Sequence, residues 1–272
     1  MTPERVVALA LAEDLGEAGD ITSDLLVPAE AEAVARVVSR RDGVLAGRAA
    51  GEEVLRQTGV QGTWWLEDGA VLAPGTIVAE IFGPARAVLT AERTLLNLLC
   101  HLSGIATLTA QYVAVCAPVA VLDTRKTTPG LRSLEKAAVV AGGGVNHRFG
   151  LYDRVLVKDN HLAVAGEGLA DAVARARRDL PDVLVEVEAD DLAGVGRALD
   201  AGADWILLDN MDPDRLREAV AVTAGRAKLE ASGGMTLEGA AAAAACGVDA
   251  VSVGALTHSA PALDLGLDID LT

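Results

Sequence analysis

Six short apolar runs in the second half of the chain constrain its fold more than any other feature. They alternate with segments of helical pattern, and each ends in a polar or small residue, which is typical of βα units. The runs VAVLD, VLVKD, LVEVE, WILLD, KLEAS and DAVSVG end at Asp123, Lys158, Glu188, Asp209, Ser232 and Gly254. The last four end residues are 21, 23 and 22 positions apart, the length of a compact βα unit. The pattern predicts six parallel strands, with a seventh left open, and therefore an incomplete α/β barrel.

The first hundred residues show a different, mixed order of elements. The sequence predicts helices over 4–15 and 49–57 and a loop over 16–28. Strands are expected in AEAVARVVSR, GVLAG, TWWLED, TIVAEIFG and ARAVL, which predicts an α+β domain. A long apolar helix from about Ala91 to Cys116 follows, with a kink or break expected at Ser103-Gly104. The alternating LDLGLDIDLT at the end is expected to return to the first domain as a strand.

The charge balance excludes some partners. The net charge is −16, so the long-range field repels nucleic acid and anionic membranes, and any anionic ligand needs a local basic cluster. Three cysteines, Cys100, Cys116 and Cys246, lie in apolar contexts without metal-ligand spacing and are expected to be reduced. The N-terminal segment resembles an amphipathic helix and not a signal peptide, and we expect no membrane span. The sequence therefore favours a cytoplasmic protein.

The densest chemical signal lies between Asp123 and Lys158. This segment has seven basic and three acidic residues inside an acidic chain. A solvated charged face is one interpretation, but Arg125 and Lys126 follow one strand end and Lys158 closes the next, which places them at the barrel mouth. Arginine binds carboxylate or phosphate through two hydrogen bonds, and lysine acts as a point charge. A ligand with several anionic groups is therefore expected, with His147 and Arg148 of GGGVNHR both able to donate to a carboxylate.

Further strand ends point to a sugar phosphate. Glu188 and Asp209 end adjacent strands, where two carboxylates can hold Mg²⁺, accept hydrogen bonds from sugar hydroxyls or act as an acid and a base. Ser232-Gly233-Gly234 opens the next helix, and Gly254 lies in a second glycine loop about one βα unit later. Backbone N–H groups at such turns bind phosphate, and barrel enzymes often use the loops of their last two strands for it. Polar residues also end strands as ordinary turn residues, but six consecutive ends of mixed chemistry favour a site.

Together these motifs resemble those of the quinolinate phosphoribosyltransferase family, also called carboxylating nicotinate-nucleotide pyrophosphorylases. The resemblance runs almost the whole length, and its strongest parts are TAERTLLNLLCHLSGIAT, DTRKTTPGLR, GGGVNHRFGL, KDNH, EVE, ILLDN, EASGG and GALTHS. It implies an N-terminal α+β sandwich domain over 1–104, to which a tail over 260–272 returns, and an α/β-barrel phosphoribosyltransferase domain over 105–259. It also implies a homodimer whose sites are shared between subunits, with assembly to a hexamer left open.

The resemblance further implies an activity and a set of site residues. The implied reaction transfers phosphoribosyl from phosphoribosyl pyrophosphate (PRPP) to quinolinate with decarboxylation, giving nicotinate mononucleotide, pyrophosphate and CO₂ in NAD biosynthesis, with Mg²⁺ as cofactor. The implied quinolinate ligands are the partner subunit's Arg93 together with Arg125, His147, Arg148 and Lys158. The implied ligands of PRPP and its phosphates are Lys126, Glu188, Asp209, Ser232, Gly233, Gly234, Gly254 and His258. Of these residues, Lys126, Lys158, Glu188 and Asp209 are the implied catalytic residues, and Glu188 and Asp209 are also the implied metal ligands.

Three other functions fit parts of the sequence. A related phosphoribosyltransferase with another acceptor, such as the relatives associated with molybdenum transport, would keep the PRPP residues and change the carboxylate-binding ones. A barrel that senses phosphosugars without catalysis would tolerate loss of Glu188 or Asp209. A phosphosugar isomerase or aldolase is the third, and a Schiff base at Lys158 would support an aldolase.

Overall fold

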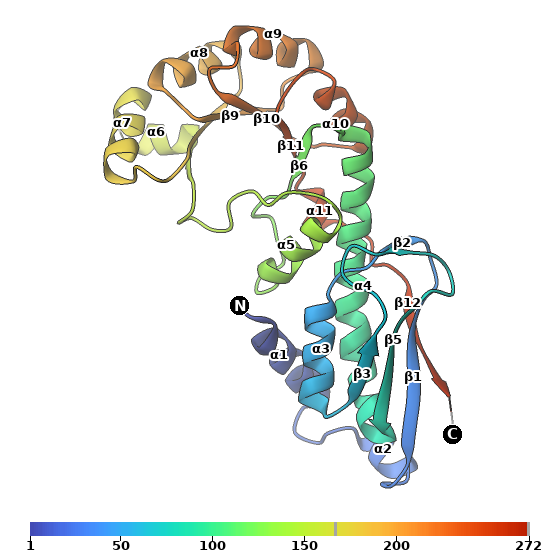
Figure 1. The fold of residues 1–272 in the computed structure, drawn as a ribbon. Coiled ribbons are helices and arrows are strands. Elements are labelled where there is room, and N and C mark those ends of the chain that lie inside the picture. Colours follow the sequence, from blue (N-terminus) through green and yellow to red (C-terminus); the bar gives the residue numbers. More distant parts are fainter. Residues whose placement is uncertain (166–167, 271–272) are drawn as a thin grey trace. The chain divides into compact units, whose positions relative to one another are not determined.

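The computed structural model describes residues 1–165 and 168–270, and it divides the chain into two compact units. Unit 1 comprises Met1–Ala110, Thr127–Gly143 and Leu256–Thr272. Unit 2 comprises Gln111–Lys126 and Gly144–Ala255. Figure 1 shows the chain passing from blue to red through both units.

Unit 1 is built on an antiparallel sheet in the order β12-β1-β5-β3. These strands are β12 (Leu265–Asp270), β1 (Glu32–Ser39), β5 (Ile77–Pro84) and β3 (Gln61–Trp64), and β2 (Gly43–Val44) pairs with β4 (Val71–Leu72). The helices are α1 (Pro3–Leu15), α2 (Ile21–Leu26), α3 (Arg48–Thr58), α5 (Arg132–Ala141) and the first part of α4 (Ala85–Cys116). A Cβ on Gly51 of α3 would lie 2.6 Å from Trp64 and 3.2 Å from Leu95, so a glycine lets α3 pack tightly between β3 and α4.

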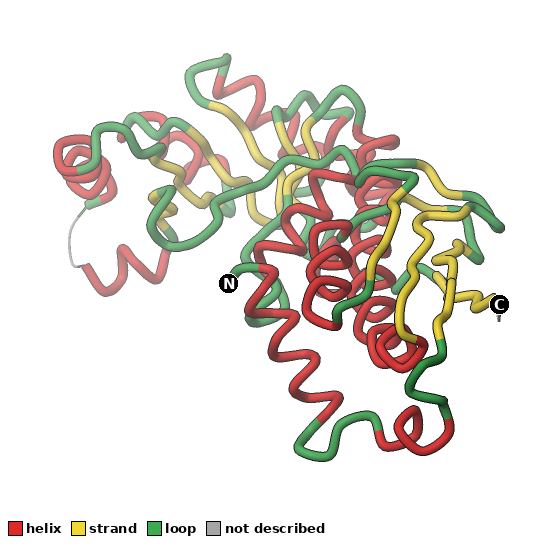
Figure 2. The backbone as a smooth tube through the Cα atoms, turned by 60° about the horizontal axis from the view of Figure 1, so that its bottom comes forward, coloured by secondary structure: helices red, strands yellow, loops and turns green. Residues whose placement is uncertain are grey.

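The C-terminal strand β12 pairs with β1, with Val34 opposite Asp270 and Ser39 opposite Leu265. Figure 2 shows this strand beside the others of the sheet. The alternating residues 265–270 therefore form a strand of the first unit, as the sequence predicts, and the last two residues of LDLGLDIDLT lie outside the described residues.

Three local predictions for unit 1 are wrong. ARAVL is not a strand: it forms the first turns of α4, where Val88 is fully buried. The expected loop over 16–28 contains the short helix α2, which begins where Asp20 accepts a hydrogen bond from the Ser23 backbone N–H. The third error is the expected break, because α4 continues as one helix through Ser103 and Gly104. A Cβ on Gly104 would lie only 2.1 Å from the Pro261 carbonyl oxygen, so this glycine permits a close backbone approach.

Helix α4 also has the length and composition of a membrane span, which the sequence analysis did not expect. Its most apolar window has a mean hydropathy of 1.4, and half of that window is buried inside the protein. Leu95 and Leu99 are fully buried and Leu102 nearly so. The core helix of a soluble protein passes the same test, and α4 packs as such a helix.

The segment 127–143 groups with unit 1, whereas the predicted domain boundary places it in the barrel. The reason is the packing of α5 on α4. Glu135 on α5 is fully buried, and its carboxylate lies 2.9 Å from His101 Nε2 on α4. A Cβ on Gly142, just after α5, would lie 2.4 Å from the Ala106 carbonyl oxygen. Residues 256–259 likewise group with unit 1.

Unit 2 is a six-stranded parallel sheet in the order β6-β11-β10-β9-β8-β7. Its strands are β6 (Ala120–Leu122), β7 (Val155–Val157), β8 (Val185–Ala189), β9 (Trp205–Asp209), β10 (Lys228–Ser232) and β11 (Ala250–Ser252). The described residues leave β6 and β7 at opposite edges without pairing between them. The prediction of an incomplete parallel barrel is confirmed.

Helices cover the outer face of this curved sheet, as the orange and yellow ribbons of Figure 1 show. They are α6 (Asp159–Ala165), α7 (Leu169–Asp179), α8 (Leu192–Ala201), α9 (Pro213–Thr223) and α10 (Leu237–Ala244), and the short α11 (Ala255–His258) follows β11. Three of them begin with a capped turn after a strand: Asp191, Asp212 and Thr236 accept hydrogen bonds from the backbone N–H groups of Gly194, Arg215 and Gly239. The inner face is therefore left for polar side chains.

Candidate active site

Neighbouring strands bring a group of acidic and hydroxyl side chains to one face of the unit 2 sheet. Side chains two residues apart on a strand share a face, so Glu186 and Glu188 lie together on β8, and Glu230 and Ser232 lie together on β10. The strand between them is β9, whose Asp209 is paired with Ser232 in the register. In the same register Glu188 and Glu230 both lie opposite Leu207. Along each strand the group therefore has an outer residue near the carboxyl end (Glu188, Asp209 and Ser232), called the outer level, and on β8 and β10 an inner residue two positions earlier (Glu186 and Glu230), called the deeper level; the register staggers the two levels from strand to strand.

At the outer level, charged groups are partly exposed and already in contact. The Lys158 ammonium is ion-paired with the Glu188 carboxylate. The Asp209 carboxylate accepts a hydrogen bond of 2.9 Å from the Asn210 side-chain amide. Oxygen and nitrogen groups of opposite charge thus meet at the rim of the sheet, where a ligand can reach them.

The glycine turn after β10 is held against Asn210. Gly233 has φ of +109°, and a Cβ there would lie 2.1 Å from Asn210 Oδ1. Asn210 itself has φ of +54°, and its backbone N–H donates to the Ser232 carbonyl at 2.9 Å. A cavity of about 290 Å³ opens beside this turn, lined by Ser232, Gly233 and Gly234 among others, and α10 begins at its edge. Backbone N–H groups and a helix N-terminus suit an anion.

The GGGVNHR segment lies along the end of β6. Val145 forms a parallel bridge with Leu122, and the His147 backbone N–H donates to Asp123 Oδ1 at 2.9 Å. This places Arg148 near Arg125. Burial lowers the pKa of Arg148, and the charge of Arg125 lowers it further. Two neighbouring guanidinium groups that repel each other are suited to an anion between them.

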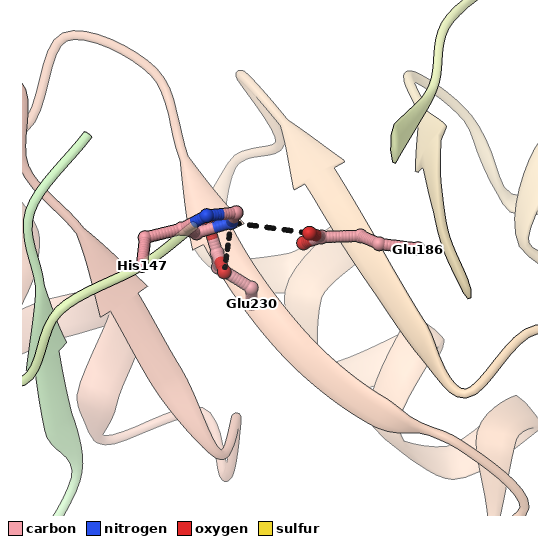
Figure 3. A group of neighbouring side chains, drawn as sticks. All are labelled: His147, Glu186 and Glu230. Atoms are coloured by element: carbon pink, nitrogen blue, oxygen red, sulfur yellow. Dashed lines mark ion pairs between the residues drawn. The ribbon is translucent and has the colours of Figure 1, made fainter. Parts of the chain in front are cut away.

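The deeper level holds a buried cluster of His147, Glu186 and Glu230 (Figure 3). His147 Nε2 lies 3.1 Å from Glu186 Oε2 and 3.3 Å from Glu230 Oε2. Both glutamates are fully buried, and His147 is 8% exposed. Arg154 also pairs with Glu186, at 3.2 Å, and its guanidinium lies 5.4 Å from the centre of the Trp205 ring. Four ionisable groups therefore share one closed environment.

The pKa values of this cluster reflect that arrangement. Burial favours the neutral ring of His147, but hydrogen bonds to Glu186 and Glu230 and their charges outweigh burial and raise its pKa to about 9. Nδ1 of the ring accepts the Arg148 backbone N–H at 2.6 Å, which favours the neutral ring. The hydrogen bonds and charges of the two glutamates outweigh burial and this one N–H contact, so the charged ring is favoured. For Glu186, burial is outweighed by His147 and Arg154 and its pKa is lowered, whereas burial raises the pKa of Glu230.

Comparison with known proteins shows the family to which the chain belongs. The family model described as quinolinate phosphoribosyl transferase, N-terminal domain, matches residues 20–103, and its C-terminal domain model matches residues 105–268. The chain belongs to the quinolinate phosphoribosyltransferase family.

Named relatives of this family match over nearly the whole length. The probable nicotinate-nucleotide pyrophosphorylase [carboxylating] of Bacillus subtilis is 43% identical over 265 residues, covering 96% of this chain and 91% of the relative. The nicotinate-nucleotide pyrophosphorylase [carboxylating] of Mycobacterium leprae is 45% identical over 269 residues, covering 96% and 94%. The Francisella tularensis enzyme structure has a TM-score of 0.92 at 38% identity, covering 98% of this chain and 96% of that one. The predicted family and fold are therefore confirmed.

Most of the residues predicted from the family resemblance lie in unit 2. They follow or end its strands, and they are Arg125, Lys126, His147, Arg148, Lys158, Glu188, Asp209, Ser232, Gly233, Gly234 and Gly254. Arg93 and His258 belong to unit 1. Arg93 is on α4, with a side chain 63% exposed, and His258 ends α11 with its ring Nδ1 2.7 Å from Ser259 Oγ. The roles given to all these residues stay predictions.

Glu186, Asn210 and Glu230 stand in the motifs EVE, ILLDN and EASGG, but the sequence alone gave none of the three a role. A signal was present for the two glutamates, because each stands two positions before a predicted site residue and so faces the same side of its strand. Asn210 gave no signal of this kind, since its left-handed backbone is visible only in the structure.

Proposed function

We propose that this protein transfers the phosphoribosyl group of PRPP to quinolinate and releases CO₂, which makes nicotinate mononucleotide for NAD biosynthesis in the cytoplasm. One observation carries the proposal. Arg125, Arg148 and Lys158, the cations of the chain's own subunit expected to bind a pyridine dicarboxylate, lie in unit 2 together with the acidic and glycine groups expected to bind an activated ribose. A related enzyme with another acceptor would lack the first set, and a sensor would have no need of the paired carboxylates.

The proposal gives each half of the site its own task. Arg125 and Arg148 receive the two carboxylates of quinolinate, and Lys158 adds a third positive charge. His147 is buried with both ring nitrogens engaged within the protein, so we assign it to the floor of this half. The partner subunit's Arg93 completes it in a homodimer, and the exposure of that side chain on α4 fits a role outside its own unit.

The other half is assigned to PRPP. Ser232, Gly233, Gly234 and Gly254 bind phosphate through turn N–H groups, together with His258. Glu188 and Asp209 end neighbouring strands on one face and offer carboxylate oxygens, the donor type that Mg²⁺ prefers. They fit the ion and the ribose hydroxyls. When bound, Mg²⁺ supplies positive charge to the leaving pyrophosphate.

Positioning and electrostatics account for the chemistry. Lys126, exposed after β6, stabilises the negative charge that grows on pyrophosphate as it leaves C1 of the ribose. The pyridine nitrogen attacks C1, and the arginines hold the ring in line for it. The ring nitrogen is then positive, so the electrons left at C2 by the departing CO₂ are stabilised beside it until a proton replaces the carboxylate.

The direct test is incubation of the purified protein with quinolinate, PRPP and Mg²⁺. We expect CO₂, nicotinate mononucleotide and pyrophosphate in equal amounts. Nicotinate in place of quinolinate is the control, because it lacks the C2 carboxylate that leaves as CO₂. Product with nicotinate alone would indicate a different acceptor. A Schiff base trapped at Lys158 by borohydride with a phosphosugar, without any CO₂ from quinolinate, would indicate an aldolase.

A further inference from the structure

Two buried glutamates of unit 2 have no task in the proposed reaction. Glu186 on β8 and Glu230 on β10 are both 0% exposed. Each lies two residues before a proposed ligand of PRPP on the same face of its strand, and so one pleat deeper than the ligand. A buried carboxylate is costly unless it is paired. Two of them on one face therefore indicate a specific role.

Their shared partner is His147. Its Nε2 lies within 3.3 Å of a carboxylate oxygen from each glutamate, and Figure 3 shows the two side chains converging on the ring from different strands. The residue is fixed at two further points. Its backbone N–H is held by Asp123, and its Nδ1 contacts the Arg148 backbone N–H. The ring thus has little freedom to turn.

Arg148 directly follows His147, and its backbone N–H donates to the His147 ring. The position of the ring therefore fixes the position of the Arg148 backbone. The two glutamates differ in what else they bind. Glu186 also pairs with a second cation, Arg154, which lies over the Trp205 ring. Glu230 pairs with His147, and its other side-chain contact is with the neutral hydroxyl of Ser252. Neutralising Glu230 should therefore act on His147 more selectively than neutralising Glu186.

We propose that Glu186 and Glu230 are positioning residues of the quinolinate half of the site: they hold the His147 ring from below, and through it the segment that presents Arg148. This rests on the proposed function. Neither glutamate touches substrate, and the PRPP half depends on other side chains on the rim. The same three residues have ligand atoms within 4.8 Å of one another, which also suits a divalent cation, but Arg154 beside Glu186 favours the ion-paired cluster.

The test compares the isosteric variants Glu230→Gln and Glu186→Gln with Glu218→Gln, an exposed position on α9. KM values for quinolinate and for PRPP are measured separately. Histidine labelled with ¹⁵N gives a second readout, because the chain has four histidines and each ring can be assigned. For Glu230→Gln we expect KM for quinolinate to rise by roughly tenfold or more, KM for PRPP to change by less than about twofold, and the His147 signals alone to move. Glu218→Gln should match the wild type.

A conservative variant separates positioning from simple stability. Glu230→Asp keeps the carboxyl group but withdraws it by one methylene, and we expect an intermediate rise in KM for quinolinate. Equal rises in both KM values, or an unchanged KM for quinolinate in a folded Glu230→Gln protein, would overturn the proposal. Binding of Zn²⁺ or Mn²⁺ to the cluster in metal titrations followed by the His147 signals would also overturn it.

Two further results keep the test decisive. If Glu230→Gln does not fold, the proposal is tested on Glu230→Asp and on the ¹⁵N-histidine spectrum of the wild type. A wild-type His147 ring whose N–H protons exchange with solvent and whose titration matches that of an exposed histidine would contradict the proposal. If the wild type shows no turnover of quinolinate, the proposed function fails. The response of the His147 signals to Glu230→Asp then still shows whether the glutamates hold the ring.

Discussion

At the scale of single residues, Arg148 shows how a cation is prepared for an anionic ligand. Its side chain is half-buried, and burial together with the neighbouring Arg125 lowers its pKa. A ligand carboxylate between the two guanidinium groups relieves their repulsion and gains bidentate hydrogen bonds. The strength of this contact depends on both charges, so the loss of one should weaken the whole half-site.

We therefore predict that Arg148→Ala loses about 2–4 kcal/mol of transition-state stabilisation, which is roughly 30- to 900-fold in kcat/KM for quinolinate. Arg217→Ala, which removes an exposed cation paired with Asp214 on α9, is the matched control and should keep wild-type activity. Steady-state kinetics with quinolinate varied at saturating PRPP make the measurement. Near wild-type turnover in Arg148→Ala would contradict the assignment.

His147 gives a residue-scale prediction about pH. Burial lowers its pKa, but hydrogen bonds to Glu186 and Glu230 and their charges raise it from 6.5 to about 9 in the folded protein. Arg154 pairs with Glu186 at 3.2 Å, and Asp123 accepts the His147 backbone N–H. Because the pKa of His147 is higher in the folded than in the unfolded state, protonation of His147 contributes to the free energy of unfolding. This contribution is fully present below pH 6.5 and is lost as the pH rises through about 9. Urea unfolding of wild type and His147→Gln should show a difference that narrows from pH 6.5 to 9.5. A constant difference across that range would count against a charged His147.

At the scale of elements, the sequence predicts the barrel strands well and the site floor poorly. WILLD and KLEAS read as strands because a parallel strand buried on both faces is a short apolar run, and their register follows from their spacing. ARAVL has the same appearance, but it is the first turn of α4, and apolar residues alone do not separate a short strand from a buried helix start. The role of Glu186 could not be predicted for a related reason: the sequence does not show that a glutamate is buried or which residue it pairs with.

The glycine turn after β10 yields a prediction for a single element. Gly233→Ala places a Cβ 2.1 Å from Asn210 Oδ1, so Asn210 must move and release its hydrogen bond to Asp209. We expect KM for PRPP to rise by roughly tenfold, equivalent to about 1.4 kcal/mol. Gly202→Ala is the control, because Gly202 also has positive φ, of +80°, but nothing within 4 Å of the new Cβ. It should lose stability by about 1–2 kcal/mol and keep its KM for PRPP. An equal rise in KM for PRPP in both variants would show that the contact between Gly233 and Asn210 is not what maintains PRPP binding.

At the scale of the whole molecule, an acidic chain has a basic segment at its proposed site for anionic substrates. The net charge of −16 keeps polyanions away, and the basic residues of 123–158 act only over short distances. Unit 1 contributes Arg93, which is exposed on α4 in its own subunit. The proposed dimer gives that exposed cation a function, since each subunit would supply it to the site of the other.

Subunit mixing tests this arrangement. Arg93→Ala and Arg148→Ala proteins, each with little activity alone, are unfolded together and refolded as a mixture. If Arg93 acts on the partner's site, a mixed dimer has one site with both arginines and one site with neither. Equal amounts should recover about a quarter of wild-type activity, because about half of the dimers are mixed and each has one intact site of two. If Arg93 acts within its own subunit, every site lacks one arginine and activity stays at the level of the separate variants. Recovery that tracks the fraction of mixed dimers, measured with a tag on one variant, establishes that the two subunits share each site.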